Sequence, residues 1–274
     1  MADCRETYKE GPRHTPGMTT HNDTVIRQFS LQSDAFSRCP AHADSKTVDV
    51  FAELGHFAPT DRLIDSGCGP GIVSEALARR VGHVQGIDLT PAMIALAGQR
   101  TAAAGLANVA FRVGDMSALP FEDGAFDGAV TRYTVHHLDA PVRALQEMVR
   151  VTRPHGRIVA LDAVPQASRR EAYDAFERRR DPSHTTALTV EEWLAMGEAL
   201  DLGPATVERF SLRMDVRDLL GHAFPDGDDR QALERTLRDD VGTNAIGMSA
   251  AEEDGVLVVY FPLAAFAWRR PTAA

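Results

Sequence analysis

The sequence has few cysteines and no long apolar run, and both absences narrow the class of protein. Its 274 residues include three cysteines, Cys4, Cys39 and Cys68, whose spacing fits neither a metal site nor a disulfide framework. No apolar run is long enough to cross a bilayer, and the N-terminus lacks the apolar core of a secretion signal. We therefore expect a cytoplasmic protein with no membrane partner.

Basic residues are also scarce, with 29 Lys and Arg against 39 Asp and Glu, and the net charge is −10. Nucleic-acid binding requires clustered Lys and Arg to neutralise phosphates. The basic run Arg178–Arg180 has acids around it, which is typical of a solvated helix face. The ten histidines are scattered, and no His-Glu-x-x-His or paired-cysteine motif occurs. We expect neither a nucleic-acid partner nor a metal.

The most informative segment is a glycine-rich turn, Asp65-Ser66-Gly67-Cys68-Gly69-Pro70-Gly71, between the apolar Leu63-Ile64 and an expected helix over 72–80. Glycine lets the backbone approach a ligand closely, and the helix behind the turn points free N–H groups at it. A dinucleotide-binding turn would need a glycine where Ile72 stands. The carboxylate of Asp65 would also repel a pyrophosphate, so the turn suits a ligand with a positive charge, such as an α-ammonium group.

Two further acids follow later expected strands. Asp88 ends the strand over 84–87, where a carboxylate can accept hydrogen bonds from ribose hydroxyls. Thr90 and Pro91 supply a cap and a first turn for the next helix, so we expect Asp88 to be free for a ligand. Asp115 and Met116 follow the strand over 109–113 and suit an exocyclic amine and the face of a ring, with a plain turn aspartate as the alternative.

With the turn over 150–156 and the strand over 157–162, these segments resemble in order the class I S-adenosylmethionine-dependent methyltransferases, and especially the subgroup of the ubiquinone and menaquinone C-methyltransferases. The resemblance covers about residues 25–200. It departs at Ser66, where an aliphatic residue is usual, and at His155, where glycine is common. It implies S-adenosyl-L-methionine as the cofactor, with the glycine turn on the methionine end. The implied cofactor-binding residues are Asp65, Gly67, Cys68, Gly69, Gly71, Asp88, Leu89, Met93, Asp115, Met116 and Arg132.

Strands and helices alternate from Leu63 to Val164, which predicts an α/β fold with a parallel sheet covered on both faces. The resemblance implies a doubly wound, mostly parallel seven-stranded sheet with a small helical cap. Further helices are expected over 91–104, 141–151, 168–180 and 190–200, and further strands over 126–131, 205–214 and 256–261.

The chain divides into five expected parts. Residues 1–20 lack apolar periodicity and should form a flexible tail, with Met18 as an alternative natural start. Residues 21–58 should form two helices, which in the resembled families act as a lid over the site. Residues 59–215 form the methyltransferase core, 216–254 an inserted cap over the substrate side, and 255–274 the final strand and tail.

The segment after the fourth strand carries the candidate catalytic residues. Ligands of open α/β sheets bind at the carboxyl ends of the strands, so His136 and His137 could act as a general base there. Neighbouring side chains diverge, so we expect at most one to reach the substrate. Phe36 and Tyr133 are candidate substrate contacts, and core packing is the alternative for Phe36. His184 is either a lid residue over the substrate or a helix-capping loop residue.

These features predict in-line methyl transfer to an O, N or C atom of a small-molecule acceptor. Two alternatives stay open from the sequence, methylation of a macromolecule and a cofactor-binding protein that acts as a cyclase or binding module. The protein is expected to be a monomer or homodimer, and the acceptor is not identified by the sequence.

Overall fold

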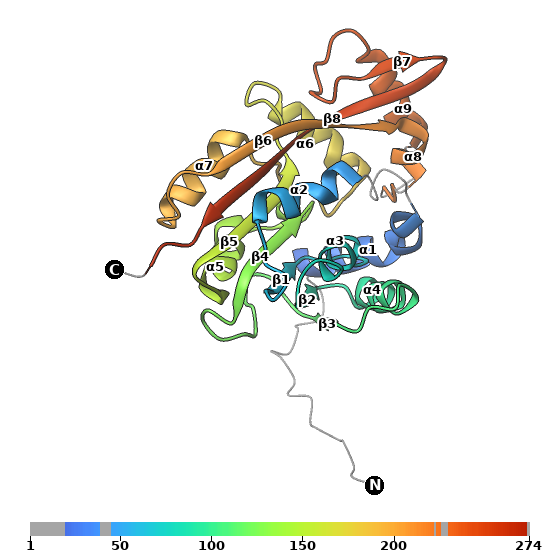
Figure 1. Ribbon diagram of the computed structural model, residues 1–274. Helices are drawn as coiled ribbons and strands as arrows, with labels where there is room; N and C mark the ends of the chain where they lie inside the picture. Colours follow the sequence, from blue (N-terminus) through green and yellow to red (C-terminus); the bar gives the residue numbers. More distant parts are fainter. Residues whose placement is uncertain (1–19, 39–44, 222, 226–229, 273–274) are drawn as a thin grey trace.

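The computed structural model describes residues 20–38, 45–221, 223–225 and 230–272 (Figure 1). The tail expected over residues 1–20 lies outside these ranges except for Thr20. Phe36 lies in the first helix, but its side chain is outside the described part, so its expected role stays a prediction.

A mixed sheet forms the centre of the molecule (Figure 1). Its strands run in the order β3-β2-β1-β4-β5-β8-β6, and β7 pairs with β8 off this path. The first five strands pair in parallel, and β8 runs antiparallel to β5, β6 and β7. The strands are β1 Arg62–Ser66, β2 His83–Asp88, β3 Val109–Val113, β4 Phe126–Arg132, β5 Thr152–Ala163, β6 Thr206–Asp215, β7 Ala251–Glu253 and β8 Val256–Arg269.

The expected doubly wound, mostly parallel fold is confirmed, with two differences in detail. The three residues of β7 add an eighth strand, too short to be recognised by its pattern. The last strand, expected over 256–261, continues to Arg269 because its apolar run goes on through Trp268. Side chains alternate along β8 as strand geometry requires: Leu263 and Ala265 pack into the core on one face, and Phe266 and Trp268 into the core on the other.

Helices cover both faces of the sheet (Figure 1). The core on one face includes side chains from α2, α3, α6, α8 and α9, and the core on the other includes side chains from α5 and α7. The helices are α1 His21–Arg38, α2 Ser45–Gly55, α3 Ile72–Ala78, α4 Pro91–Ala103, α5 Pro141–Val151, α6 Arg170–Arg180, α7 Val190–Ala199, α8 Val216–Gly221 and α9 Arg230–Asp239, with a 3-10 turn, η2, at Val135–His137. The segment expected to form a cap, 216–254, contains α8, α9 and β7.

The conformation of the turn over residues 153–156 accounts for the glycine that is common in the resembled family where this chain has His155. This residue has φ +64°, a conformation that favours glycine. The next residue must be glycine for a different reason, since a Cβ on Gly156 would lie 2.5 Å from the carbonyl oxygen of Asp127 on β4. The turn is therefore packed against the neighbouring strand, and His155 occupies its left-handed position.

Candidate active site

The strand order reverses between β1 and β4, where open α/β sheets bind ligands. A cavity of about 360 Å³ lies there, at the carboxyl ends of the strands. All of the predicted cofactor-binding residues except Gly71 line it. Gly71 lies against α4. A Cβ at this position, where φ is +78°, would be 2.9 Å from the Cβ of Ala97, so only glycine fits. Gly71 brings α3 and α4 together, and its contact with the cofactor stays a prediction.

The glycine turn is held against the end of β2. The backbone N–H groups of Gly67 and Cys68 both donate to the carbonyl oxygen of Ile87, at 2.8 and 3.0 Å. A Cβ on Gly67 would lie 2.4 Å from the side chain of Thr134, which follows β4. The turn thus has no room for a side chain at position 67, and its backbone forms one wall of the cavity.

Asp88 is not free in the way that the sequence predicts. One carboxylate oxygen accepts from the backbone N–H of Gly69 at 2.8 Å, and the other accepts from that of Thr90 at 2.8 Å. The hydroxyl of Thr90 makes no capping hydrogen bond to α4, and the bond from the Thr90 N–H to Asp88 holds the residue just before that helix. Each carboxylate oxygen can accept a second hydrogen bond. Asp88 therefore shapes the glycine turn and still offers lone pairs to the cavity.

Asp65 is a buried acid that lines the same cavity. Ser74 on α3 donates to its carboxylate at 2.6 Å, and its side chain is otherwise surrounded by protein. Burial raises the pKa of Asp65 to about 6, although the Ser74 hydrogen bond and the charge of Arg132 act in the opposite direction. A cationic group entering the cavity would favour the ionised form, which suits the α-ammonium group of the expected cofactor.

Asp115, Met116 and Leu89 also line this cavity. One oxygen of Asp115 accepts a hydrogen bond from the backbone N–H of Ser117 at 2.7 Å, as expected of an aspartate in a turn. Met116 is buried and presents an apolar wall. Met116 and Asp115 therefore give the cavity an apolar surface and a hydrogen-bond acceptor, which fits a purine ring.

Arg132 also lies at the cavity wall, at the end of β4. Its guanidinium donates to the hydroxyl of Thr47 on α2 at 3.0 Å and lies over the ring of Tyr133, 5.1 Å from its centroid. These contacts fix a positive charge near Asp65. A positive and several negative groups in one cavity fit a ligand that carries both an ammonium and a carboxylate.

A second cavity, of about 90 Å³, lies beside the first and was not predicted from the sequence. Three residues line both cavities: Phe29 of α1, Tyr133 after β4 and His137 of η2. The rest of the lining is mostly apolar, with a small group of charged side chains. The other lining residues are Gln32, His136, Ala163, Tyr173, Glu177, Arg180, Asp181, Leu212, Met214, Leu219, Phe261 and Leu263.

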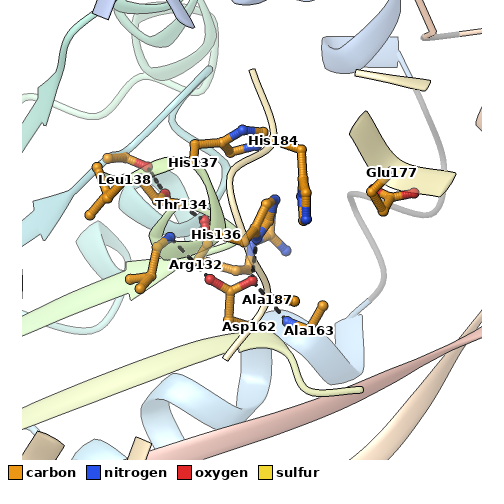
Figure 2. A network of polar contacts seen from close by, with 12 residues as sticks. Arg132, Thr134, His136, His137, Leu138, Asp162, Ala163, Glu177, His184 and Ala187 are labelled. Carbon is orange, nitrogen blue, oxygen red and sulfur yellow. Dashed lines mark hydrogen bonds and ion pairs between the residues drawn. The ribbon is translucent and has the colours of Figure 1, made fainter. Parts of the chain in front are cut away.

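His136 is held by a buried carboxylate at the end of β5 (Figure 2). Its Nδ1 lies 2.5 Å from Oδ1 of Asp162, which also accepts a hydrogen bond from the backbone N–H of Ala163, while Oδ2 accepts one from that of Val135. Burial lowers the pKa of His136, but the Asp162 carboxylate outweighs this and, with Glu177 and Asp181 nearby, raises the pKa above its usual value. An apolar strand that ends in an acid was the sequence signal for Asp162.

His137 has a different environment, although its ring centroid lies only 4.2 Å from that of His136. Its Nδ1 lies 3.0 Å from the carbonyl oxygen of Ser183 and 3.1 Å from the hydroxyl of the same residue. Burial lowers the pKa of His137 well below the usual value, and the neighbouring His136 lowers it further. The two adjacent histidines therefore differ in the ease with which they take a proton, while both side chains reach the second cavity. The expectation that at most one of them reaches the substrate stays a prediction.

Tyr133 and His184, the two other predicted substrate contacts whose side chains are described, differ in position. Tyr133 lies between the two cavities, with φ +54°. His184 lines neither of these cavities, since its ring is buried and its Nε2 lies 2.8 Å from a carboxylate oxygen of Asp174 on α6.

Within the described part of the chain, no group of three or more His, Cys, Asp or Glu side chains could hold a metal ion, and no helix is long and apolar enough to cross a membrane.

Comparisons with known proteins agree with this site. Residues 64–160 match the family model described as a methyltransferase domain. The uncharacterised methyltransferase YcgJ of Bacillus subtilis is 28% identical over 67% of this chain and 74% of its own length. A demethylmenaquinone methyltransferase of Symbiobacterium thermophilum is 32% identical over 43% of this chain and 49% of its own length.

Solved structures share the fold. The crystal structure of YcgJ superposes with a TM-score of 0.75 and 22% identity, covering 84% of this chain and all of that one. The [4+2]-cyclase SpnF superposes with a TM-score of 0.64 and 18% identity, covering 94% of this chain and 98% of that one. At these identities the likeness concerns the fold alone.

The matched domain and its named relatives define an S-adenosylmethionine-dependent methyltransferase. Residues 64–160 form a methyltransferase domain whose cofactor is S-adenosyl-L-methionine, and this domain contains the whole glycine turn, Asp88 and Asp115.

Proposed function

We propose that this enzyme methylates a small, largely apolar acceptor bound in the second cavity. The observation that carries the proposal is the common wall of the two cavities, formed by Phe29, Tyr133 and His137. A cofactor in the larger cavity and an acceptor in the smaller one would meet at this wall. Most of the other residues around the smaller cavity are apolar, which favours an acceptor with a hydrophobic body.

When bound, S-adenosyl-L-methionine supplies a methyl group on a cationic sulfur, which is already an activated electrophile. The chain then has to align the acceptor, exclude water and accept a proton. Alignment can lower a barrier by about 7–11 kcal/mol, and a positioned base adds about 10²–10⁴ in rate. His136 and His137 are the proposed catalytic residues for the proton, and Tyr133 is a proposed substrate contact.

The proposed cofactor contacts follow the first cavity. The glycine turn with Asp65 and Arg132 would hold the methionine end, and Asp88 the ribose. The apolar wall at Leu89 and Met116, with Asp115, would hold the adenine. Met93, buried in α4, would support this wall from behind.

We also propose that the first two helices and the segment 216–254 act as lid and cap. Helix α1 contributes Asn22, Val25 and Phe29 to the cofactor cavity and reaches the second cavity through Phe29 and Gln32. Helix α8 contributes Leu219 to the second cavity. Both segments must therefore be in place for the acceptor to be enclosed.

The test combines activity with a block of the second cavity. The protein is incubated with methyl-labelled cofactor and a panel of phenols, quinones, amines and carboxylates. Leu212→Trp should fill the second cavity and lower methylation at least about tenfold, while calorimetry finds unchanged affinity for S-adenosylhomocysteine. Val142→Trp, at an exposed position of α5, is the matched control. Full activity of Leu212→Trp would overturn the placement of the acceptor.

A further inference from the structure

Helix α6 directs three polar side chains at the second cavity. Tyr173, Glu177 and Arg180 follow one another at spacings of four and three residues, which places them on one face of a helix. All three line the cavity, among side chains that are mostly apolar. Polar groups are costly in apolar surroundings unless they have hydrogen-bond partners. The hydrogens of this face that lack a partner in the protein therefore indicate what a ligand has to supply.

Arg180 and Glu177 satisfy one another only in part. The guanidinium donates from Nε to Oε1 of Glu177 at 2.9 Å and from Nη2 to Oε2 at 2.6 Å, and both side chains are largely buried. A guanidinium carries five hydrogens, and this pairing uses one on Nε and one on Nη2. Nη1 has no hydrogen-bond partner among the described residues. Its hydrogens are therefore available to a ligand in the cavity.

The Tyr173 hydroxyl is a second donor without a partner. Its oxygen makes no hydrogen bond with any residue that the structure describes, and the side chain is buried. The oxygen is not sealed inside the protein, as Nδ1 of His184 is, so the cavity is the space left for its partner. Burial raises the pKa of Tyr173 well above its usual value, and Glu177 adds to this while Arg180 opposes it. The hydroxyl therefore keeps its hydrogen and can donate it.

The charges around these donors limit the ligand. Arg180 carries a positive charge, but Glu177 and Asp181, which line the same cavity, each carry a negative one. The carboxylate of Asp181 already accepts hydrogen bonds from Gln32 and Ser183. A ligand carboxylate on Arg180 would add a third negative charge in mostly apolar surroundings, where like charges repel strongly. A neutral oxygen accepts the same hydrogen bonds without this repulsion.

Resting on the proposed function, we propose that the acceptor is an uncharged carbonyl compound, with Arg180 and Tyr173 as the specificity-determining residues that donate hydrogen bonds to carbonyl oxygen. A carbonyl oxygen has two lone pairs and no hydrogen, so it matches a helix face whose unpaired groups are donors. A molecule without the oxygen leaves those donors unpaired, and sites of this kind reject such analogues. His136 and His137, which line the cavity from η2, keep their proposed role toward the proton.

Three probes of similar shape test the acceptor class: acetophenone, ethylbenzene and benzoate. Ligand-detected NMR titrations give their dissociation constants on the complex with S-adenosylhomocysteine at pH 8.5, where imidazole groups are ordinarily neutral. Acetophenone should bind at least about tenfold more tightly than either of the others. Leu212→Trp should abolish its binding, and the control Val142→Trp should not. Equal binding of acetophenone and ethylbenzene, tighter binding of benzoate, or binding of none of the three would overturn the inference.

Two variants assign the preference to α6. Tyr173→Phe removes a hydroxyl with no partner in the described protein, so stability should be unchanged while acetophenone binds at least about threefold more weakly and ethylbenzene as before. Glu177→Gln keeps the shape and removes a negative charge, so benzoate should bind at least about tenfold more tightly. Unchanged affinity for S-adenosylhomocysteine confirms that both variants fold. Wild-type binding of acetophenone by Tyr173→Phe, or no gain for benzoate in Glu177→Gln, would overturn these assignments. The proposed function fails separately, through unchanged methylation by Leu212→Trp.

Discussion

The side-chain amide of Gln32 donates to a carboxylate oxygen of Asp181 at 2.8 Å, across 149 residues of sequence. The other oxygen of Asp181 accepts from both the backbone N–H and the hydroxyl of Ser183, which in turn fixes Nδ1 of His137. One buried carboxylate thus connects the expected lid helix α1 to a proposed catalytic residue.

Gln32→Leu should weaken the packing of α1 against the rest of the protein, because it removes the hydrogen bond to Asp181. A hydrogen bond to a buried charged group contributes roughly 1.5–3 kcal/mol, and Asp181 is almost fully buried. We expect unfolding free energy to fall by about that amount and amide exchange in α1 to accelerate. Chemical denaturation and hydrogen-exchange mass spectrometry measure the two effects.

Gln28, one turn earlier on the same helix, provides the matched control. Its side chain is fully buried, and among the described residues its amide has no hydrogen-bond partner. Gln28→Leu removes this unpaired amide and should stabilise the protein by about 1 kcal/mol. If both substitutions destabilise α1 equally, the Gln32–Asp181 contact has no special role.

Asp88→Ala should weaken binding of S-adenosylhomocysteine by about 1.5–3 kcal/mol, the scale of hydrogen bonds to a charged group. Part of the loss would come from the glycine turn, because Gly69 and Thr90 lose their acceptor. Asp88→Asn keeps one acceptor oxygen and should lose less. Isothermal calorimetry on the three proteins decides this, and equal affinities would contradict the ribose assignment.

Asp65 should make the cofactor-free protein less stable as pH rises. Its folded pKa of about 6 lies above the usual value of 3.8 for an aspartate, so the folded state holds a proton that the unfolded state has already lost. Stability is therefore lost between about pH 4 and pH 6, by roughly 2–3 kcal/mol.

Asp65→Asn removes this penalty, so its advantage over the wild type should grow from pH 4 to pH 7 and then level off. Thermal denaturation over this range measures it. The same variant should bind S-adenosylhomocysteine more weakly at pH 7, since the carboxylate is gone. A stability difference that does not change with pH would show that Asp65 titrates normally.

The turn after α5 allows a paired test of backbone strain. His155→Gly relieves a left-handed conformation at an exposed position and should stabilise the protein by up to about 1 kcal/mol. Gly156→Ala, one residue on, should destabilise it by more than 1 kcal/mol, because the new Cβ meets the Asp127 carbonyl oxygen. Denaturant midpoints of both variants are the measurement, and the opposite order of stability would refute this account.

Local pattern predicted most of the fold. The helix over 141–151 and the strand over 109–113 occur with the expected bounds, because a proline in the first turn and apolar periodicity are local signals. The short strand β7 has three residues, which is too few for a period of two to be recognised. The far end of β8 was missed because a continuous apolar run does not mark where a strand ends.

The cofactor cavity could be predicted and the second cavity could not, for a physical reason. The glycine turn, Asp88 and Asp115 lie within about fifty residues and each follows a strand, so sheet topology alone brings them together. The second cavity joins Phe29, Asp181 and Phe261, which only tertiary packing makes neighbours. The opposite environments of His136 and His137 depend on Asp162 and Ser183, and no spacing in the sequence pairs them.

The position of β8 has a consequence for synthesis on the ribosome. Strands β1 to β5 are parallel neighbours made in one continuous stretch, so the cofactor cavity can assemble while the chain is still growing. Strand β6 pairs with β8 along its whole length and, among the described strands, with nothing else, so it must wait for some forty residues of further translation. Leu212 and Phe261, from these two strands, line the second cavity. Nascent chains are therefore expected to acquire a binding site for the cofactor before they acquire one for the acceptor.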